Sequence, residues 1–148
     1  MTTLRWLADR PTWLLTRANA RAHALLTEAF ATRGLRGYHA RLLAALDELG
    51  PASQAELGRH AEIDRSDVVA CLNDLIARGF ATRQPDPADR RRNIVTITAR
   101  GRRELARLSE LLDGVQRALL APLSAAERRT FVRLLAKLVA DDPVSATR

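Results

Sequence analysis

The chain has 148 residues, of which 47% are hydrophobic and 28% are charged, and this is the composition of one ordinary folded domain. These proportions exclude a disordered, collagen-like or disulfide-stapled chain. Lys and Arg outnumber Asp and Glu by 24 to 17, which gives a formal net charge of +7. This basic excess favours a polyanionic partner such as nucleic acid.

The single cysteine, Cys71, excludes an internal disulfide and is typical of a reducing compartment. The N-terminal residues lack the apolar region of a signal peptide, because charged residues such as Arg5, Asp9 and Arg10 interrupt them. No stretch of the sequence approaches the roughly 18 apolar residues that a membrane helix needs. We therefore expect a cytoplasmic protein that has no membrane partner.

Apolar residues recur at three- and four-residue spacing in the first third of the chain, and this spacing predicts helices. The first helix is expected from Pro11 to Thr32, because proline suits a first helical turn and Gly34 interrupts the pattern. The second helix is expected from about Tyr38 to Leu49, where the pair Gly50-Pro51 ends it.

Two shorter helices are expected next. Ser53 and Glu56 have the spacing of a capping box, in which each residue satisfies a backbone amide of the other, so a third helix begins at Ser53. A fourth helix opens at Asp64, carries an apolar stripe that includes Val68, and closes at Gly79.

The hydrophobic period changes after this fourth helix. Residues 80–83 and 93–98 have the pattern of strands, and the polar connection between them is rich in turn-forming residues. Two short helices followed by such a hairpin predict a winged helix-turn-helix. We call the hairpin of residues 80–98 the wing, and the helix that opens at Asp64 the recognition helix.

Two further helices are expected after the wing. The first follows Thr98 and carries leucine and valine at a spacing that forms a narrow apolar seam, suited to packing against another helix. Pro122 ends it, and a second capping box at Ser124 and Glu127 opens the last helix.

Positive charge is concentrated at the wing and just after it. Seven arginines and two acids lie between Thr82 and Arg103, which gives this segment a local net charge of +5. A solvated loop and a polyanion-binding tip would share this composition. The helix-turn-helix directly upstream favours the second reading, in which the arginines enter a DNA minor groove.

The recognition helix is expected to lie in the major groove. Arg65 could contact guanine or phosphate, Val69 a thymine methyl group, and Asn73 a phosphate. Asp67 more readily caps its own helix than meets a cytosine. Together with the third helix's first turn and the wing tip, the expected DNA-binding residues are Ser53, Gln54, Arg65, Ser66, Asp67, Val69, Asn73, Arg90, Arg91 and Arg92.

Several segments together resemble one family. The wing sequence of residues 86–91 and 95–101, with residues 53–58 and 75–80 upstream, is similar to the MarR family of transcriptional regulators. The resemblance covers essentially the whole chain. It implies a mainly α fold with a small β-hairpin wing, which is a winged helix-turn-helix joined to a helical dimerisation region.

The resemblance also implies a domain plan. Residues 1–148 would form a single MarR-type domain, with residues 38–98 as the winged helix-turn-helix and residues 5–34 and 99–141 as the dimerisation part. The protein would be a homodimer that binds double-stranded DNA at a pseudo-palindromic operator.

The resemblance assigns roles within the wing and the recognition helix. The family's wing arginine falls on Arg91, and Asp89 falls on the acid that braces the basic neighbours, while Arg90 and Arg92 add charge to the tip. The family usually carries a hydroxyl residue and often a basic one where this chain has Val69 and Ala70. We therefore expect less direct base readout and a greater contribution from the wing.

The resemblance further implies a cleft between the dimerisation helices and the winged part that binds small aromatic acids or phenols. Trp13 and Arg17 lie four residues apart on one helix face, so a ring and a guanidinium could receive an aromatic carboxylate. His23 would join them only if the cleft wraps the helix or the partner contributes, and Tyr38 and His39 could form the far wall. Trp13 could equally be a dimer-interface aromatic, Arg17 part of a salt bridge, and each histidine an ordinary polar residue.

Other chemistry finds little support in the sequence. The histidines are too far apart for a metal site, no cofactor motif is present, and Cys71 between apolar neighbours is more typical of a buried thiol than of a redox sensor. We expect no enzyme, no cofactor and no metal. The sequence thus predicts a DNA-binding repressor released by a small aromatic or phenolic ligand. The alternatives are a ligand-independent DNA-binding regulator and a protein–protein adaptor.

Overall fold

A computed structural model describes residues 4–140, so the ends of the expected domain, residues 1–3 and 141–148, lie outside the described residues. The described chain forms six helices and a small sheet, which confirms the mainly α fold with a β wing. The elements are α1 (Pro11–Ala31), α2 (Gly37–Leu49), β1 (Ala52–Ser53), α3 (Gln54–Ala61), α4 (Arg65–Ala77), β2 (Ala81–Pro85), β3 (Asn93–Ile97), α5 (Ala99–Leu119) and α6 (Ala125–Ala140).

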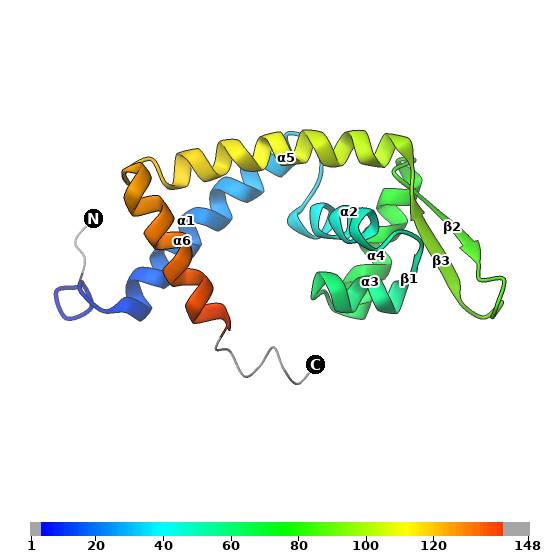
Figure 1. The fold of residues 1–148 in the computed structure, drawn as a ribbon, viewed down its shortest axis with the longest axis horizontal. Coiled ribbons are helices and arrows are strands. Elements are labelled where there is room, and N and C mark those ends of the chain that lie inside the picture. Colours follow the sequence, from blue (N-terminus) through cyan, green and yellow to red (C-terminus); the bar gives the residue numbers. More distant parts are fainter. Residues whose placement is uncertain (1–3, 141–148) are drawn as a thin grey trace.

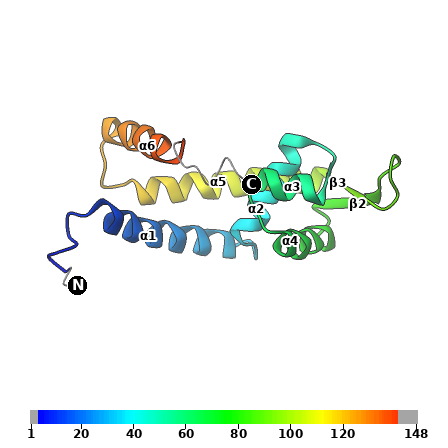
Figure 2. The ribbon, with the colours of Figure 1, turned by 90° about the horizontal axis from the view of Figure 1, so that it is seen from below.

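Helix α5 runs along one side of the molecule and joins its two parts (Figure 1). The C-terminal half of α5 lies beside α1 and leads into α6, whereas its N-terminal end lies over α2, α4 and the sheet (Figures 1 and 2). Within residues 4–140, no helix is long and apolar enough to cross a bilayer.

The sheet has three strands in the order β1-β3-β2, and all neighbours are antiparallel. The hairpin of β2 and β3 is the predicted wing, with Arg83 opposite Val95. Strand β1 was not predicted, because its two residues are too short to show an alternating pattern. It pairs Ala52 with Val95 and so fixes the start of α3 beside the base of the wing.

The hydrophobic core lies mainly in the winged part. Leu42, Leu43 and Leu46 of α2 are fully buried against leucines from α3 and α4. Cys71 of α4 is fully buried as expected, and burial raises the pKa of its thiol, so the reactive thiolate is disfavoured. By contrast, α6 has no buried residue in this single chain.

Both predicted capping boxes are present. The Ser53 amide donates to Glu56 Oε2 over 2.7 Å, and the Glu56 amide donates to Ser53 Oγ over 3.3 Å. Ser124 and Glu127 repeat the same pair of bonds at 2.7 and 3.3 Å. These local bonds satisfy amides that a helix start leaves free, so the sequence places both helix starts correctly.

Candidate nucleic-acid interface

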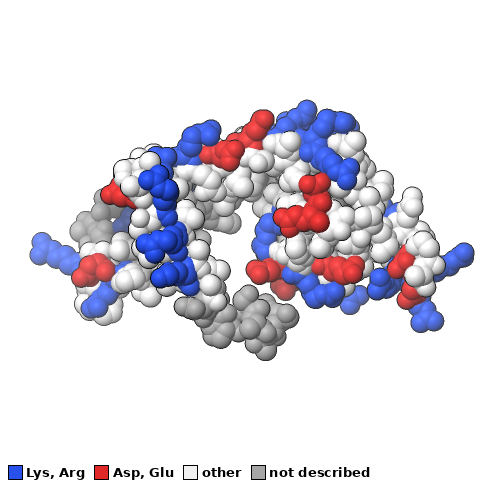
Figure 3. Space-filling model, in the orientation of Figure 1, with Lys and Arg blue, Asp and Glu red and all other residues white. Residues whose placement is uncertain are grey.

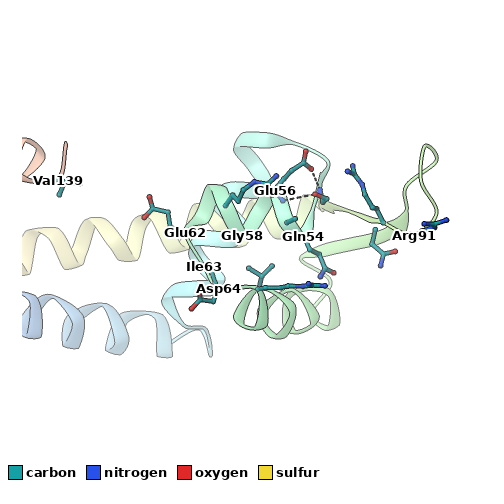
Figure 4. A pocket seen from close by; sticks show the side chains of 15 residues that line it. Gln54, Glu56, Gly58, Glu62, Ile63, Asp64, Arg91 and Val139 are labelled. Atoms are coloured by element: carbon teal, nitrogen blue, oxygen red, sulfur yellow. Dashed lines mark hydrogen bonds between the residues drawn. The ribbon is translucent and has the colours of Figure 1, made fainter. Parts of the chain in front are cut away.

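One open groove of about 1140 Å³ lies where α3, the start of α4 and the base of the wing meet. Figure 4 shows the lining side chains on these three elements, with Val139 of α6 lying apart from the others. Its lining includes the predicted residues Ser53, Gln54, Arg65, Arg91 and Arg92. Residues from distant parts of the sequence therefore share one concave surface.

The start of α3 has a more structural role than expected. Ser53 is buried and is held in the capping box, so its hydroxyl oxygen already accepts the Glu56 amide. Gln54 is half-buried and lines the groove as the first residue of α3. The capping box already bonds the amides of Ser53 and Glu56 at this helix start, so a phosphate contact by the first turn of α3 stays a prediction.

The recognition helix α4 buries one face and exposes the other. Val68, Cys71, Leu72 and Leu75 are buried, while an outward face is formed by Ser66, Val69, Ala70 and Asn73. Arg65, the first residue of α4, is exposed and lines the groove. Asp67 does not cap α4. It lies in the first turn, where the positive end of the helix dipole stabilises a carboxylate, and the capping position belongs to Asp64.

The charge of the groove is mixed, because Arg59, Arg65, Arg91 and Arg92 share it with three acids. One of these acids, Glu56, has a lowered pKa because the Ser53 amide and hydroxyl bond it, with smaller contributions from Arg92 and Arg59. Figure 3 shows blue and red side chains alternating over the winged part, with blue side chains projecting at the wing tip. The wing tip therefore presents arginine side chains to solvent beside a groove of mixed charge.

An ion pair within the wing braces its tip, but the acid is not the expected one. Arg92 Nη2 donates to Asp86 Oδ2 over 3.2 Å, and Asp86 Oδ1 accepts the Ala88 amide over 2.9 Å. The Asp89 carboxylate accepts the backbone amide of Arg91 over 3.0 Å and forms no ion pair in the described structure. The expectation for Asp89 needs this correction, because the antiparallel turn brings Asp86, the nearly buried residue after β2, opposite Arg92.

Ionic contacts distinguish the three tip arginines. Arg92 is engaged with Asp86, whereas the side chains of Arg90 and Arg91 are exposed and form no ion pair within the described part of the chain. The latter two are therefore the wing cations best placed to meet a phosphate backbone.

Two arginines of the interface were not singled out from the sequence. Arg59 lies on the exposed side of α3 and lines the groove. Arg83 of β2 donates from Nη2 to Asn73 Oδ1 over 3.0 Å, so it links the wing to the recognition helix. Arg83 was counted in the basic segment, but only the strand register shows that its side chain reaches α4.

The expected ligand residues lie on α1 and at the start of α2, and none of the five lines the groove described above. Trp13 is half-buried, and its Nε1 is shielded from solvent without a hydrogen-bond partner. Arg17 and His23 are exposed on the same helix. Tyr38 is exposed, and the Arg41 guanidinium lies 5.7 Å from its ring centre.

His39 has a structural role that uses both of its ring nitrogens. The Arg36 amide donates to His39 Nδ1 over 3.0 Å, so Nε2 carries the proton and donates to Asp74 Oδ2 over 3.1 Å. His39 is 4% exposed, and its imidazole joins the start of α2 to α4. A buried ring with both nitrogens engaged has no group to offer a ligand, so its place in the far wall of a cleft is not supported.

Comparisons with known proteins agree with this architecture. A family model described as the MarR family matches residues 33–92. The HTH-type transcriptional repressor NicR of Pseudomonas putida is 30% identical over 129 residues, covering 87% of this chain and 82% of NicR.

Two solved structures are similar over most of their length. Bordetella bronchiseptica BpsR, described for the regulation of its DNA binding by 6-hydroxynicotinic acid, is 28% identical with a TM-score of 0.77, and the match covers 88% of this chain and 99% of BpsR. The repressor CouR bound to a 23-mer DNA duplex is 27% identical with a TM-score of 0.82, covering 94% of this chain and 99% of CouR. The chain thus belongs to the MarR family of transcriptional regulators, which are DNA-binding proteins and not enzymes.

Proposed function

We propose that the protein is a homodimeric repressor that binds a pseudo-palindromic operator through its two winged parts and is released by a small aromatic acid or phenol. The observation that carries the DNA-binding part is the shared groove, where Arg65 at the start of the recognition helix faces the same concave surface as Arg91 of the wing. A helix start for the major groove and a basic hairpin for the adjacent backbone or minor groove form one continuous DNA-binding surface.

Exposed apolar side chains support the homodimer. Helix α6 exposes Val132, Leu138 and Val139 by 58%, 64% and 71%, and α1 exposes Leu14 by 51%. Such a surface on both terminal helices is costly in water and is typical of a dimer interface. A twofold dimer would hold two recognition helices about 34–36 Å apart, the spacing of successive major grooves.

The ligand part of the proposal rests on Trp13 and Arg17, which are four residues apart on α1. The shielded Nε1 of Trp13 lacks an acceptor in the single chain, and a ligand or the second protomer could supply one. BpsR, which is similar over 88% of this chain, is described with 6-hydroxynicotinic acid, an aromatic carboxylic acid. We therefore propose that an aromatic carboxylate binds beside α1, with Arg17 as the bidentate donor.

The DNA-binding proposal is tested by fluorescence anisotropy with a duplex of the intergenic DNA upstream of the gene that encodes the protein. We expect the observed binding constant to fall linearly on a log–log plot as salt rises, because each phosphate contact releases counterions. Absence of binding at low salt, or a binding constant that does not change with salt, contradicts the proposal.

The ligand is tested separately by tryptophan fluorescence. The experiment uses a Trp6→Phe protein so that Trp13 is the only tryptophan, because Trp6 is 76% exposed and would add background fluorescence. We expect 6-hydroxynicotinic acid or another member of a panel of aromatic acids and phenols to quench Trp13 and to weaken DNA binding, and Arg17→Ala to abolish both effects. A protein that binds DNA but responds to no member of the panel is a ligand-independent regulator.

A further inference from the structure

The hydrogen bond between Arg83 and Asn73 has a chemical consequence for DNA recognition. A guanidinium can only donate hydrogen bonds, so Asn73 must turn its carbonyl oxygen toward Arg83, at 3.0 Å from Nη2. The Asn73 amide group is thereby fixed with its two Nδ2 hydrogens directed away from Arg83. A free asparagine could present either end to DNA, but this one presents donors.

Asn73 lies on the outward face of the recognition helix. It is exposed and follows Ser66 by seven residues, two helical turns along the same face. The exposed residues between them on this face are Val69 and Ala70, which offer no polar side-chain group. Beyond the first turn, Asn73 is therefore the next hydrogen-bonding side chain that this face offers to a DNA groove.

Arg83 is held in place from the wing side. It is half-buried in β2, paired across the sheet with Val95, and its Nε is shielded from solvent without a hydrogen-bond partner. Nε of Arg83 is shielded from solvent, while Nη2 bonds Asn73. The position of this guanidinium is therefore set by the packing of β2 and not by hydration. The contact thus transmits the position of the wing to a residue of the recognition helix.

We propose that Arg83 is a positioning residue that sets Asn73 as a hydrogen-bond donor to an acceptor of the bound DNA, and this inference rests on the proposed DNA-binding function. The acceptor is a phosphate oxygen or the O6 and N7 edge of a guanine, both of which accept without donating. Paired recognition of adenine, which also needs the Asn73 carbonyl oxygen, is disfavoured because Arg83 already uses that oxygen.

The test is a double-mutant cycle on the full-length protein with the same intergenic duplex. Asn73→Ala and Arg83→Met should each weaken binding by roughly 3–10-fold, the effect of one hydrogen bond. In the Asn73→Ala background, Arg83→Met should have no further effect beyond about twofold, because Arg83 acts through Asn73. The salt dependence should stay unchanged in Arg83→Met, whereas loss of a direct phosphate contact would lower its slope by about one.

Three controls make the outcome decisive. Arg83→Lys keeps a donor and should restore most of the affinity that Arg83→Met loses, which separates the hydrogen bond from a folding defect. Arg117→Met, at an exposed residue in the last turn of α5 outside the groove, should leave binding unchanged. Duplexes with single base changes distinguish the acceptors: a loss from Asn73→Ala that is uniform across sequences identifies phosphate, and one confined to a G·C pair identifies guanine.

A spectrum of the DNA-free protein tests the geometry independently. The side-chain NH₂ signals of Asn73, assigned with Asn73→Ala, should shift in Arg83→Met. This inference is overturned if the signals are unchanged, or if Arg83→Met costs the same affinity in the wild-type and Asn73→Ala backgrounds. In either case the proposed function still stands when the wild-type protein binds the duplex. A wild-type protein that binds no duplex contradicts both.

Discussion

Arg33 donates two parallel hydrogen bonds to Glu104, from Nε to Oε1 and from Nη2 to Oε2, each over 2.8 Å. This pair joins the turn after α1 to the first part of α5. The Glu104 side chain is 3% exposed, whereas that of Arg33 is 38% exposed. Arg107 adds a longer contact of 3.4 Å to the same carboxylate. A nearly buried carboxylate of α5 therefore anchors the turn that follows α1.

Removal of this carboxylate should destabilise the protein. Glu104→Gln is expected to lower the free energy of unfolding by roughly 2–3 kcal/mol at pH 7, below the loss for a fully buried pair because Arg33 can turn toward solvent. Chemical denaturation measures the change. Glu110→Gln, at an exposed residue of the same helix, is the matched control and should change stability little.

The same pair predicts a pH dependence of stability. The hydrogen bonds from Arg33 lower the pKa of Glu104, and burial opposes them only in part. A carboxyl with a lowered pKa stabilises the folded state above its unfolded pKa of about 4.3, and this contribution is lost as the pH falls through the folded value. Wild-type melting temperature should therefore fall more steeply than that of Glu104→Gln between about pH 5 and pH 3. Parallel curves would contradict the assignment.

At Gly101, α5 packs tightly against the backbone at the base of the wing. A Cβ atom at this position would lie 2.1 Å from the carbonyl oxygen of Phe80 and 2.8 Å from Ile97 Cγ1. The Phe80 oxygen belongs to backbone that also accepts the Thr98 amide, so it cannot move without breaking that bond. Gly101→Ala should cost about 1–3 kcal/mol of stability, measured by denaturation. Gly114→Ala, where a Cβ would meet only the end of Arg117, should not destabilise.

The wing tip is predicted to act through charge. Arg90→Ala combined with Arg91→Ala should weaken DNA binding and lower the slope of the salt dependence by about two, one for each phosphate contact. The fold should remain intact, because neither side chain forms an ion pair in the described structure. Anisotropy at several salt concentrations measures the slope. An unchanged slope would place the phosphate contacts elsewhere, while unchanged binding of a protein partner would favour an adaptor.

The exposed apolar face of α6 is predicted to hold the dimer together. Leu138→Glu should produce a monomer at micromolar concentration. Leu138 is 64% exposed in the single chain, and the proposed dimer would bury it, so the substitution would place a charge inside the interface. Lys137→Glu introduces the same side chain one residue earlier and serves as the matched control. Analytical ultracentrifugation distinguishes the two species, and a wild-type monomer would refute the interface itself.

Local sequence patterns predicted the helices well. The features that they missed, strand β1 and the ionic partner within the wing, depend on contacts that form only in the folded chain. The capping residues Ser53 and Ser124 act within four residues of chain, so their spacing alone located two helix starts. Strand β1, in contrast, exists only because Ala52 lies opposite Val95, 43 positions later in the chain. The wing arginines could be predicted as a cluster, but the choice of Asp86 over Asp89 as the ionic partner depends on the shape of the turn.

The link that His39 makes between the Arg36 amide and Asp74 has a mechanical consequence. Because the imidazole joins the start of α2 to the C-terminal part of α4, these two helices cannot slide past each other without exposing a buried ring. Under the proposed function, a ligand bound beside α1 would therefore tilt the winged part as one body, and this tilt would change the distance between the two recognition helices of the dimer.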